Sequence, residues 1–288
     1  MNRNPTVNRE AIHSPQFTDN SQIPIRNPLN RRCRTGGWAA CTFVLIVTLP
    51  SLRAQDNYEI QVYGSETVPR GMTMVELHSN FTSEGVRPAG RSMLSSHHAL
   101  HETVEITRGF TDWFETGFYF FTSVQPGRGW EWVGDHIRPR VRVPESWHWP
   151  VGLSLSTEFG YKRRAFSDNT WNWEIRPIID KEFGRWYVSL NPTVGKVVHG
   201  PDSNQGFELS PSIKIAFDLN QKIAVGIEYY ADLGPITRIA PWREQGHTIY
   251  PTLDLNLSPR WEINFGVGIG LTQSTDSLNV KLILGRRF

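Results

Sequence analysis

WEINFGVGIGL, residues 261–271, decides the fold, because its side chains change character at every second position. One set is apolar: Trp261, Ile263, Phe265, Val267, Ile269 and Leu271. The other set is polar or small: Glu262, Asn264, Gly266, Gly268 and Gly270. Successive side chains of a β-strand point to opposite faces, so this stretch predicts a strand with one apolar and one polar face.

The same period of two continues outward from this stretch through most of the chain. It predicts strands near residues 71–82, 98–108, 112–123, 134–143, 150–162, 170–181, 185–197, 206–218, 221–233, 246–257, 260–271 and 277–288. A tilted strand that crosses a bilayer needs about 9–11 residues, whereas strands of soluble sheets usually have about 5–6. The length of these segments therefore favours a membrane barrel of about 12 strands.

The connections between the predicted strands alternate in length. Residues 109–111, 183–184, 219–221 and 258–259 leave room only for tight turns. The stretches 83–97, 124–133, 163–169, 198–205 and 234–245 are longer. Short turns on one side and long loops on the other are typical of outer-membrane barrels. Because an open sheet edge cannot be hydrated in hydrocarbon, we predict an all-β, closed antiparallel transmembrane β-barrel.

A short apolar run, WAACTFVLIVTLP at residues 38–50, follows three arginines and is followed by Ala54. It is too short for a membrane-spanning helix, which needs about 20 residues, and it has the layout of a secretory signal peptide. The alternative is a short buried helix. We predict residues 1–54 as an N-terminal extension and a signal peptide cleaved near Ala54. Residues 55–70 then form a periplasmic or lumenal segment, and residues 71–288 form the barrel.

Aromatic side chains lie near the ends of the predicted strands, as expected where amphipathic rings meet a membrane interface. They are Phe114, Trp149, Trp186, Phe217, Trp261 and Phe288 at one rim, and Trp171 and Phe207 at the other. A soluble β-sandwich with an aromatic core is the alternative. Glu102 falls on the apolar face, and prolines at positions 139, 177, 192, 211 and 251 lie within strands. Since proline cannot donate to the ladder, we predict local bulges at these five positions.

The last 28 residues, ending in Phe288 with apolar residues at alternate positions before it, resemble the final hairpin of Gram-negative outer-membrane barrels. The resemblance implies that Phe288 is part of the signal read by the barrel-assembly machinery. More narrowly, Gly266, Gly268, Gly270 and the ending Gly285-x-x-Phe288 resemble a transporter-like barrel family associated with aromatic meta-pathway degradation. The broad resemblance to outer-membrane barrels, which covers residues 55–288, implies a membrane location and passage of small molecules, and it supplies no catalytic residue.

The face opposite the apolar one is rich in charge, with acids and bases mixed. We expect these side chains to line the lumen: Glu76, His78, His101, Glu105, Arg138, Arg140, Arg142, Glu158, Glu174, Arg176, Lys214, Glu228, Asp254, Glu262 and Lys281. Rings of charged side chains line selective pores. The same pattern also fits structural ion pairs that fill a narrow barrel. The sequence leaves both interpretations open.

The overall composition gives no indication of nucleic-acid binding, because the formal net charge is only +2. No phosphate-binding glycine loop is present, and we expect no cofactor. His97, His98 and His101 do not share one strand face and lack an acidic or cysteine partner, so no metal site is predicted.

The leading hypothesis is a passive outer-membrane channel or transporter for a small solute or aromatic compound. The alternatives are a non-conducting structural or adhesion barrel and, less favoured, a lipid-modifying enzyme. His78 and Ser79 are adjacent and so point to opposite faces, which argues against a hydrolase pair. The expected partners are membrane lipid and lipopolysaccharide, together with periplasmic chaperones and the assembly machinery. The sequence does not predict the oligomeric state.

Overall fold

The computed structural model describes residues 57–86 and 93–288, which form twelve strands and one short 3-10 helix. The predicted signal peptide lies outside the described residues. None of the described helices is long and apolar enough to cross a membrane. The strands are β1 Thr73–Glu84, β2 Leu100–Thr111, β3 Phe114–Gln125, β4 Gly129–Arg142, β5 Gly152–Lys162, β6 Trp171–Phe183, β7 Trp186–His199, β8 Glu208–Asn220, β9 Ile223–Asp232, β10 Gly246–Ser258, β11 Trp261–Gly270 and β12 Leu278–Arg287, and η1 is Glu145–Trp147.

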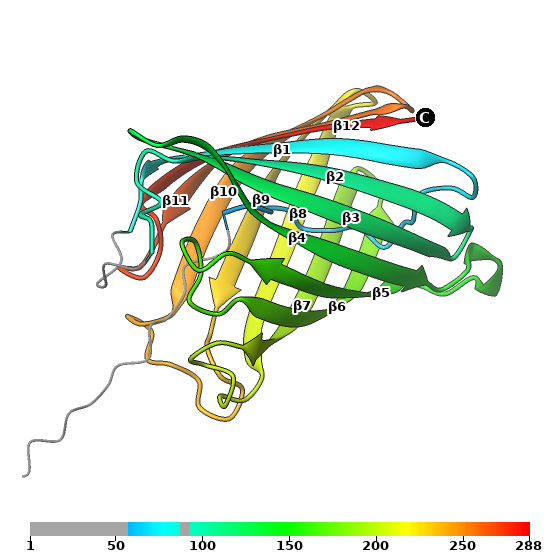
Figure 1. The fold of residues 1–288 in the computed structure, drawn as a ribbon. Helices are drawn as coiled ribbons and strands as arrows, with labels where there is room; N and C mark the ends of the chain where they lie inside the picture. Colours follow the sequence, from blue (N-terminus) through cyan, green and yellow to red (C-terminus); the bar gives the residue numbers. More distant parts are fainter. Residues whose placement is uncertain (1–56, 87–92) are drawn as a thin grey trace, which may run out of the picture. The chain divides into compact units, whose positions relative to one another are not determined.

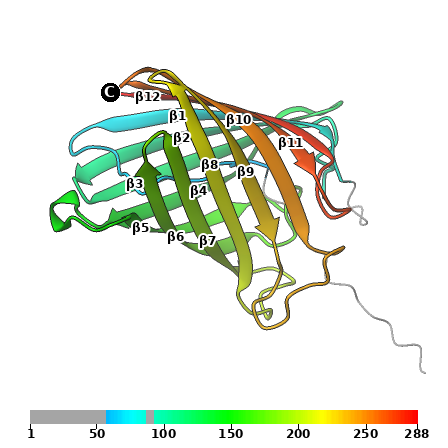
Figure 2. The same ribbon diagram turned by 180° about the vertical axis from the view of Figure 1, so that it is seen from behind.

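Every strand pairs with its sequence neighbours, and β1 pairs with β12, so the sheet closes on itself (Figure 1, Figure 2). The closing pair is antiparallel and runs from Met74 opposite Arg287 to Glu84 opposite Leu278. Closure gives each strand two hydrogen-bonded neighbours and removes the sheet edge, as a hydrocarbon environment requires. The predicted fold, a closed antiparallel β-barrel of about 12 strands, is confirmed.

The two faces of the wall differ as the period-two pattern predicted. In β12, Leu282 and Leu284 are exposed on the outer face, while Lys281 and Ile283 are buried inside. Exposed aromatic rings lie near both rims: Trp149, Trp186, Trp261 and Phe288 at the short-turn rim, and Trp171 and Phe207 at the long-loop rim. Soluble monomers rarely expose contiguous apolar surface on this scale.

The strands match the predicted segments closely except for β4. It begins at Gly129, and the predicted loop over residues 124–133 is reduced to residues 126–128. The β3–β4 pairing contains a register shift: Phe121 pairs with Gly134, whereas Thr122 pairs with Trp132. Val133 is therefore an extra residue in β4. The bulge turns Val133 into the barrel, where it is fully buried, and interrupts the alternation that the sequence analysis relied on.

The predicted bulges at the five prolines are wrong. Pro192 pairs directly with Pro211 in an unshifted register between β7 and β8. Between β6 and β7 the same register holds on both sides of Pro177, from the pair Ile175–Val194 to the pair Ile179–Leu190. Only alternate residue pairs of an antiparallel ladder exchange hydrogen bonds. A proline, which lacks the backbone N–H, therefore removes at most a local hydrogen bond. It does not add the extra residue that defines a bulge.

Residues 57–70 run through the interior of the barrel in an extended conformation before β1 begins (Figure 1, Figure 2). We call them the lumen segment. Two wall glycines make room for it. A side chain at Gly109 would place its Cβ 2.2 Å from the carbonyl oxygen of Val68, and one at Gly152 would place it 2.2 Å from Oγ of Ser65. The sequence had left open whether these residues were lumenal or periplasmic.

Candidate functional site

The candidate site is the inner face of the barrel together with the lumen segment. The charged residues predicted to face inward lie on the more buried face of their strands. Nine are buried: Glu76, His78, His101, Glu105, Arg138, Arg140, Glu158, Glu228 and Lys281. Six are half-buried: Arg142, Glu174, Arg176, Lys214, Asp254 and Glu262. The structure brings most of them together into three ion-pair clusters.

The first cluster lies on β2, β3 and β4 and is built around Arg138. Its Nη2 lies 2.6 Å from Oε1 of Glu105 and 3.5 Å from Oε1 of Glu115. Arg140 lies 2.6 Å from the same Glu115 oxygen. The spacing of two along β4 places both guanidinium groups on one face, and the facing carboxylates neutralise them. Removing one member of such a buried pair leaves the other charge uncompensated.

The second cluster lies on β4, β5 and β6 and includes the lumen segment. Arg176 lies 2.6 Å from Glu174 on its own strand and 3.2 Å from Glu59. Next to this group, the ring of His136 contacts the carboxylate of Glu158. Glu59 was not singled out from the sequence. Its ion pair with Arg176 connects the lumen segment to strand β6 of the wall.

The third cluster lies on β8, β9, β10 and β12. Glu228 is fully buried and contacts both Lys281 and Lys214. Lys214 also lies 2.8 Å from Asp254. The Nζ atom of Lys281 donates to the carbonyl oxygen of Ile60, so this cluster also holds the lumen segment.

Five predicted lumenal residues stand apart from these clusters: Glu76 and His78 on β1, and Arg142, His101 and Glu262. Arg142 lies at the short-turn rim and pairs with Glu145, which is 80% exposed. His101 packs edge-on against the ring of Tyr58. Glu262 lies 4.0 Å from Arg287 near the same rim. Phe288 is 63% exposed at the rim, and its backbone pairs with Thr73 to complete the β1–β12 seam.

Tyr63 is the central side chain of the lumen segment, and three arginines surround its ring. The guanidinium carbons of Arg138, Arg176 and Arg140 lie 4.6, 4.7 and 5.7 Å from the ring centre. Its hydroxyl group contacts Glu59 and forms a 2.9 Å hydrogen bond with the hydroxyl of Tyr119. Cations over an aromatic face are attracted by its quadrupole, and the attraction is stronger where water is excluded.

Side chains of the wall also form hydrogen bonds with backbone N–H and carbonyl groups of the lumen segment. The side-chain amide of Asn191 accepts from the backbone N–H of Tyr63 at 2.8 Å and donates to its carbonyl at 3.0 Å. Asp180 accepts from the N–H and the hydroxyl of Ser65. Arg140 donates to the carbonyls of Gly64 and Glu66. Because an extended segment in a lumen has no strand partner, these side chains replace the missing ladder.

Apolar residues of the lumen segment pack against inward aromatic rings on two sides of the barrel. Tyr58 joins Tyr119, Phe121 and Val133 in one buried cluster. Ile60 and Val62 join Tyr230 and Tyr250 in another. The alternation of Tyr58, Ile60 and Val62 with polar residues was a signal that the sequence analysis did not use.

The residues considered for hydrolysis or for a histidine cluster are not brought together. His78 points inward and is fully buried, whereas Ser79 points outward and donates to Oε1 of Glu102 at 2.8 Å. Glu102 therefore lies on the outer wall, as the sequence pattern indicated, with a hydroxyl partner. His97 stacks on His98 in the long-loop region, away from His101 in β2.

Comparison with known proteins yields no matching family model and no matching curated protein. Among solved structures, the COG4313 outer membrane channel from Pseudomonas putida F1 aligns with a TM-score of 0.54 and 12% identity, covering 80% of this chain and 100% of that one. The KdgM porin aligns at 0.47 and 11% identity, covering 75% and 99%. Omp33 of Acinetobacter baumannii aligns at 0.41 and 10% identity, covering 78% and 100%. The alignment with the COG4313 channel shows that the two chains share a barrel fold.

Proposed function

We propose that the chain is an outer-membrane channel that passes small solutes through a charged lumen controlled by the lumen segment. The observation that carries the proposal is the contrast between its two faces. Outward residues such as Leu155 and Ile227 are apolar and exposed, whereas inward ones such as Arg138 and Glu228 are charged and buried. A closed sheet with this polarity matches a bilayer outside and a hydrophilic path inside.

The contacts of the lumen segment favour a low-conductance resting state. Tyr63 contacts Tyr119 in β3 and Asn191 in β7, so the segment bridges strands from different parts of the wall. The interior of a twelve-stranded barrel is wider than that of an eight-stranded barrel, which side chains fill, and narrower than that of a sixteen-stranded porin. A peptide segment held by ion pairs and hydrogen bonds therefore limits the free cross-section, and its release would widen the path.

We also propose the finer features that the sequence suggested. The solutes that pass through the channel are small molecules, aromatic compounds among them. The chain is exported with a leader that ends near Ala54, and the assembly machinery recognises the strand that ends at Phe288. Loop arginines such as Arg238 and Arg243 contact lipopolysaccharide. The protein acts without catalysis, an interpretation supported by the opposite orientations of His78 and Ser79.

The test is to reconstitute the full-length protein in planar bilayers and record single-channel currents. Efflux of a small aromatic acid and of a small sugar from proteoliposomes would then compare solute classes. We expect small unitary currents and faster efflux than from empty vesicles, with the aromatic acid favoured. Folded protein that neither conducts nor releases either solute would refute the channel.

A further inference from the structure

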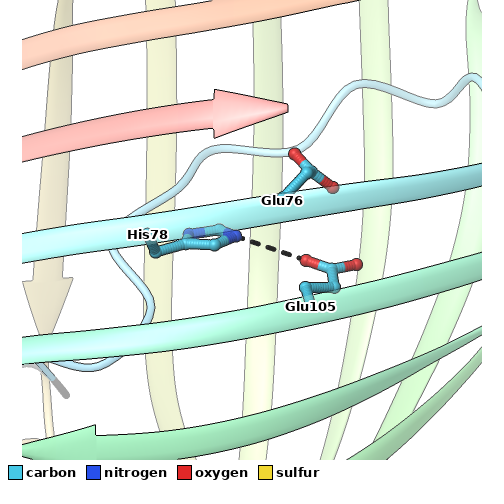
Figure 3. Close-up of side chains that lie close together, drawn as sticks. All are labelled: Glu76, His78 and Glu105. Atoms are coloured by element: carbon cyan, nitrogen blue, oxygen red, sulfur yellow. Dashed lines mark ion pairs between the residues drawn. The ribbon is translucent and has the colours of Figure 1, made fainter. Parts of the chain in front are cut away.

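Three inward side chains at the β1–β2 pair form a cluster that the channel proposal does not use. Glu76 and His78 are two residues apart on β1 and so share its inner face. Glu105 on β2 is the direct cross-strand partner of Glu76. One ligand atom from each of the three residues lies within 4.8 Å of the others, and all three residues are buried (Figure 3).

The charges of this cluster do not balance within it. Two carboxylates directly opposite each other repel, and the repulsion is stronger where water is excluded. Oε1 of Glu105 is neutralised by Arg138 at 2.6 Å. Glu76 is 6% exposed, and its carboxylate forms no side-chain hydrogen bond or ion pair within residues 57–86 and 93–288. A further positive charge between the two carboxylates would remove this imbalance.

His78 supplies the second, independent observation. Its side chain is fully buried, and neither ring nitrogen has a hydrogen bond within the described part of the chain. The ring is directed at Glu105, and Figure 3 marks the ion pair that a protonated His78 would form with it. The distance between Nε2 and Oε2 is 3.4 Å. That oxygen has no hydrogen-bond partner either. Two ligands that each lie about 2.1 Å from one zinc ion at a tetrahedral angle are about 3.4 Å apart.

We propose that Glu76, His78 and Glu105 bind one divalent transition-metal ion of the zinc type. Nε2 of His78 and Oε2 of Glu105 are two ligands, and a carboxylate oxygen of Glu76 is the third. Oε1 of Glu105 stays with Arg138 and with the hydroxyl of Thr107 at 2.6 Å, which orients the ligand carboxylate from behind. The imidazole argues against Mg²⁺ and Ca²⁺, which prefer oxygen-only sites.

The position of the site suggests what the ion does. It would join β1 to β2 beside the β1–β12 seam, where the first and last strands close the barrel. The ion adds a cross-link to strands that otherwise pair through their backbones. The sequence predicted no metal site on the strength of His97, His98 and His101 alone. The cluster of Glu76, His78 and Glu105 becomes visible only in the β1–β2 register, in which Glu76 lies opposite Glu105.

The test uses the folded, full-length protein in detergent after EDTA treatment and dialysis, with Zn²⁺ as the probe. Isothermal titration and metal analysis of the dialysed protein measure affinity and stoichiometry. We expect one Zn²⁺ per chain in the wild type and at least tenfold weaker binding in His78→Gln and in Glu76→Gln. The matched control is His101→Gln, a buried inward histidine outside the cluster, and it should bind as the wild type does.

Two measurements on the wild type keep the proposal testable if a variant does not fold. X-ray absorption at the zinc edge should show one imidazole nitrogen with oxygen ligands. Zn²⁺, but not Mg²⁺, should raise the temperature at which the folded electrophoretic mobility is lost. Absence of stoichiometric Zn²⁺, an oxygen-only edge spectrum, or equal binding by His78→Gln and His101→Gln would overturn the site.

Discussion

Replacing Tyr63 with alanine should release the lumen segment and raise the open probability of the channel. The substitution removes the ring from three guanidinium groups at 4.6, 4.7 and 5.7 Å and removes the hydrogen bond to Tyr119. Each desolvated cation–π contact contributes about 0.5–2 kcal/mol, and the hydrogen bond contributes about 1 kcal/mol. Because the three arginines share one ring, we expect a total of about 3 kcal/mol.

A change of about 3 kcal/mol shifts the balance between the docked and the released segment by roughly 100-fold, since 1.4 kcal/mol is tenfold. Single-channel recording should show this shift as more frequent and longer large openings. Tyr63→Phe keeps the ring and loses the hydrogen bond to Tyr119, worth about 1 kcal/mol, so it should shift the same balance by only about fivefold. Gly109→Ala provides an independent route, because its Cβ would lie 2.2 Å from the carbonyl oxygen of Val68 and displace the segment's backbone.

The matched control for Tyr63→Ala is Tyr161→Ala, which removes the same side chain from the outer face of β5. Tyr161 packs against Trp171 and Trp132 and does not contact the lumen segment. If Tyr63→Ala and Tyr161→Ala have the same open probability in folded protein, the lumen segment does not control the path.

Two further predictions concern the stability of the barrel, measured by urea unfolding in lipid vesicles and followed by electrophoretic mobility. Arg138→Met should lower the free energy of unfolding by about 3–5 kcal/mol, because Glu105 loses its buried arginine partner and Glu115 keeps only Arg140. Arg142→Met should cost less than about 1 kcal/mol, because its partner Glu145 is 80% exposed. Equal effects would contradict the packed ion-pair interior. Ile227→Arg, on the outer face of mid-β9, should cost about 2–4 kcal/mol, whereas Val198→Arg near the long-loop end of β7 should cost about 0–1 kcal/mol. Similar costs at these two positions would contradict the depth assigned to them.

The architecture could be predicted because each wall residue meets one of two very different environments. In residues 261–271 the apolar side chains lie on the outer face and the polar or small ones on the inner face, so the alternation is visible in the sequence. The failures have local causes. The bulge at Val133 reverses the alternation, which hid the first five residues of β4. Prolines at positions 177 and 192 interrupt backbone bonds without shifting the register, so the predicted bulges do not form.

The site was less predictable than the wall. The sequence indicated which charged residues face inward, but the partners depend on the register between strands and on contacts across the lumen. Glu76 and Glu105 become neighbours only through the β1–β2 register. The alternation within the lumen segment does not indicate which wall residues it contacts, such as Asn191 with Tyr63. Short amphipathic stretches like residues 58–63 fit a lumen segment and a periplasmic tail equally well.

The most direct test of the central claim is a spin-label scan along four consecutive positions of β5 in reconstituted bilayers. Ser154→Cys and Ser156→Cys place the label on the buried inner face, and Leu155→Cys and Thr157→Cys place it on the more exposed outer face. Oxygen concentrates in lipid, so we predict collision rates with oxygen that are high at positions 155 and 157 and low at 154 and 156. Rates without this period of two, or four positions equally accessible to a water-soluble nickel reagent, would contradict a barrel with a lipid-facing and a lumen-facing side.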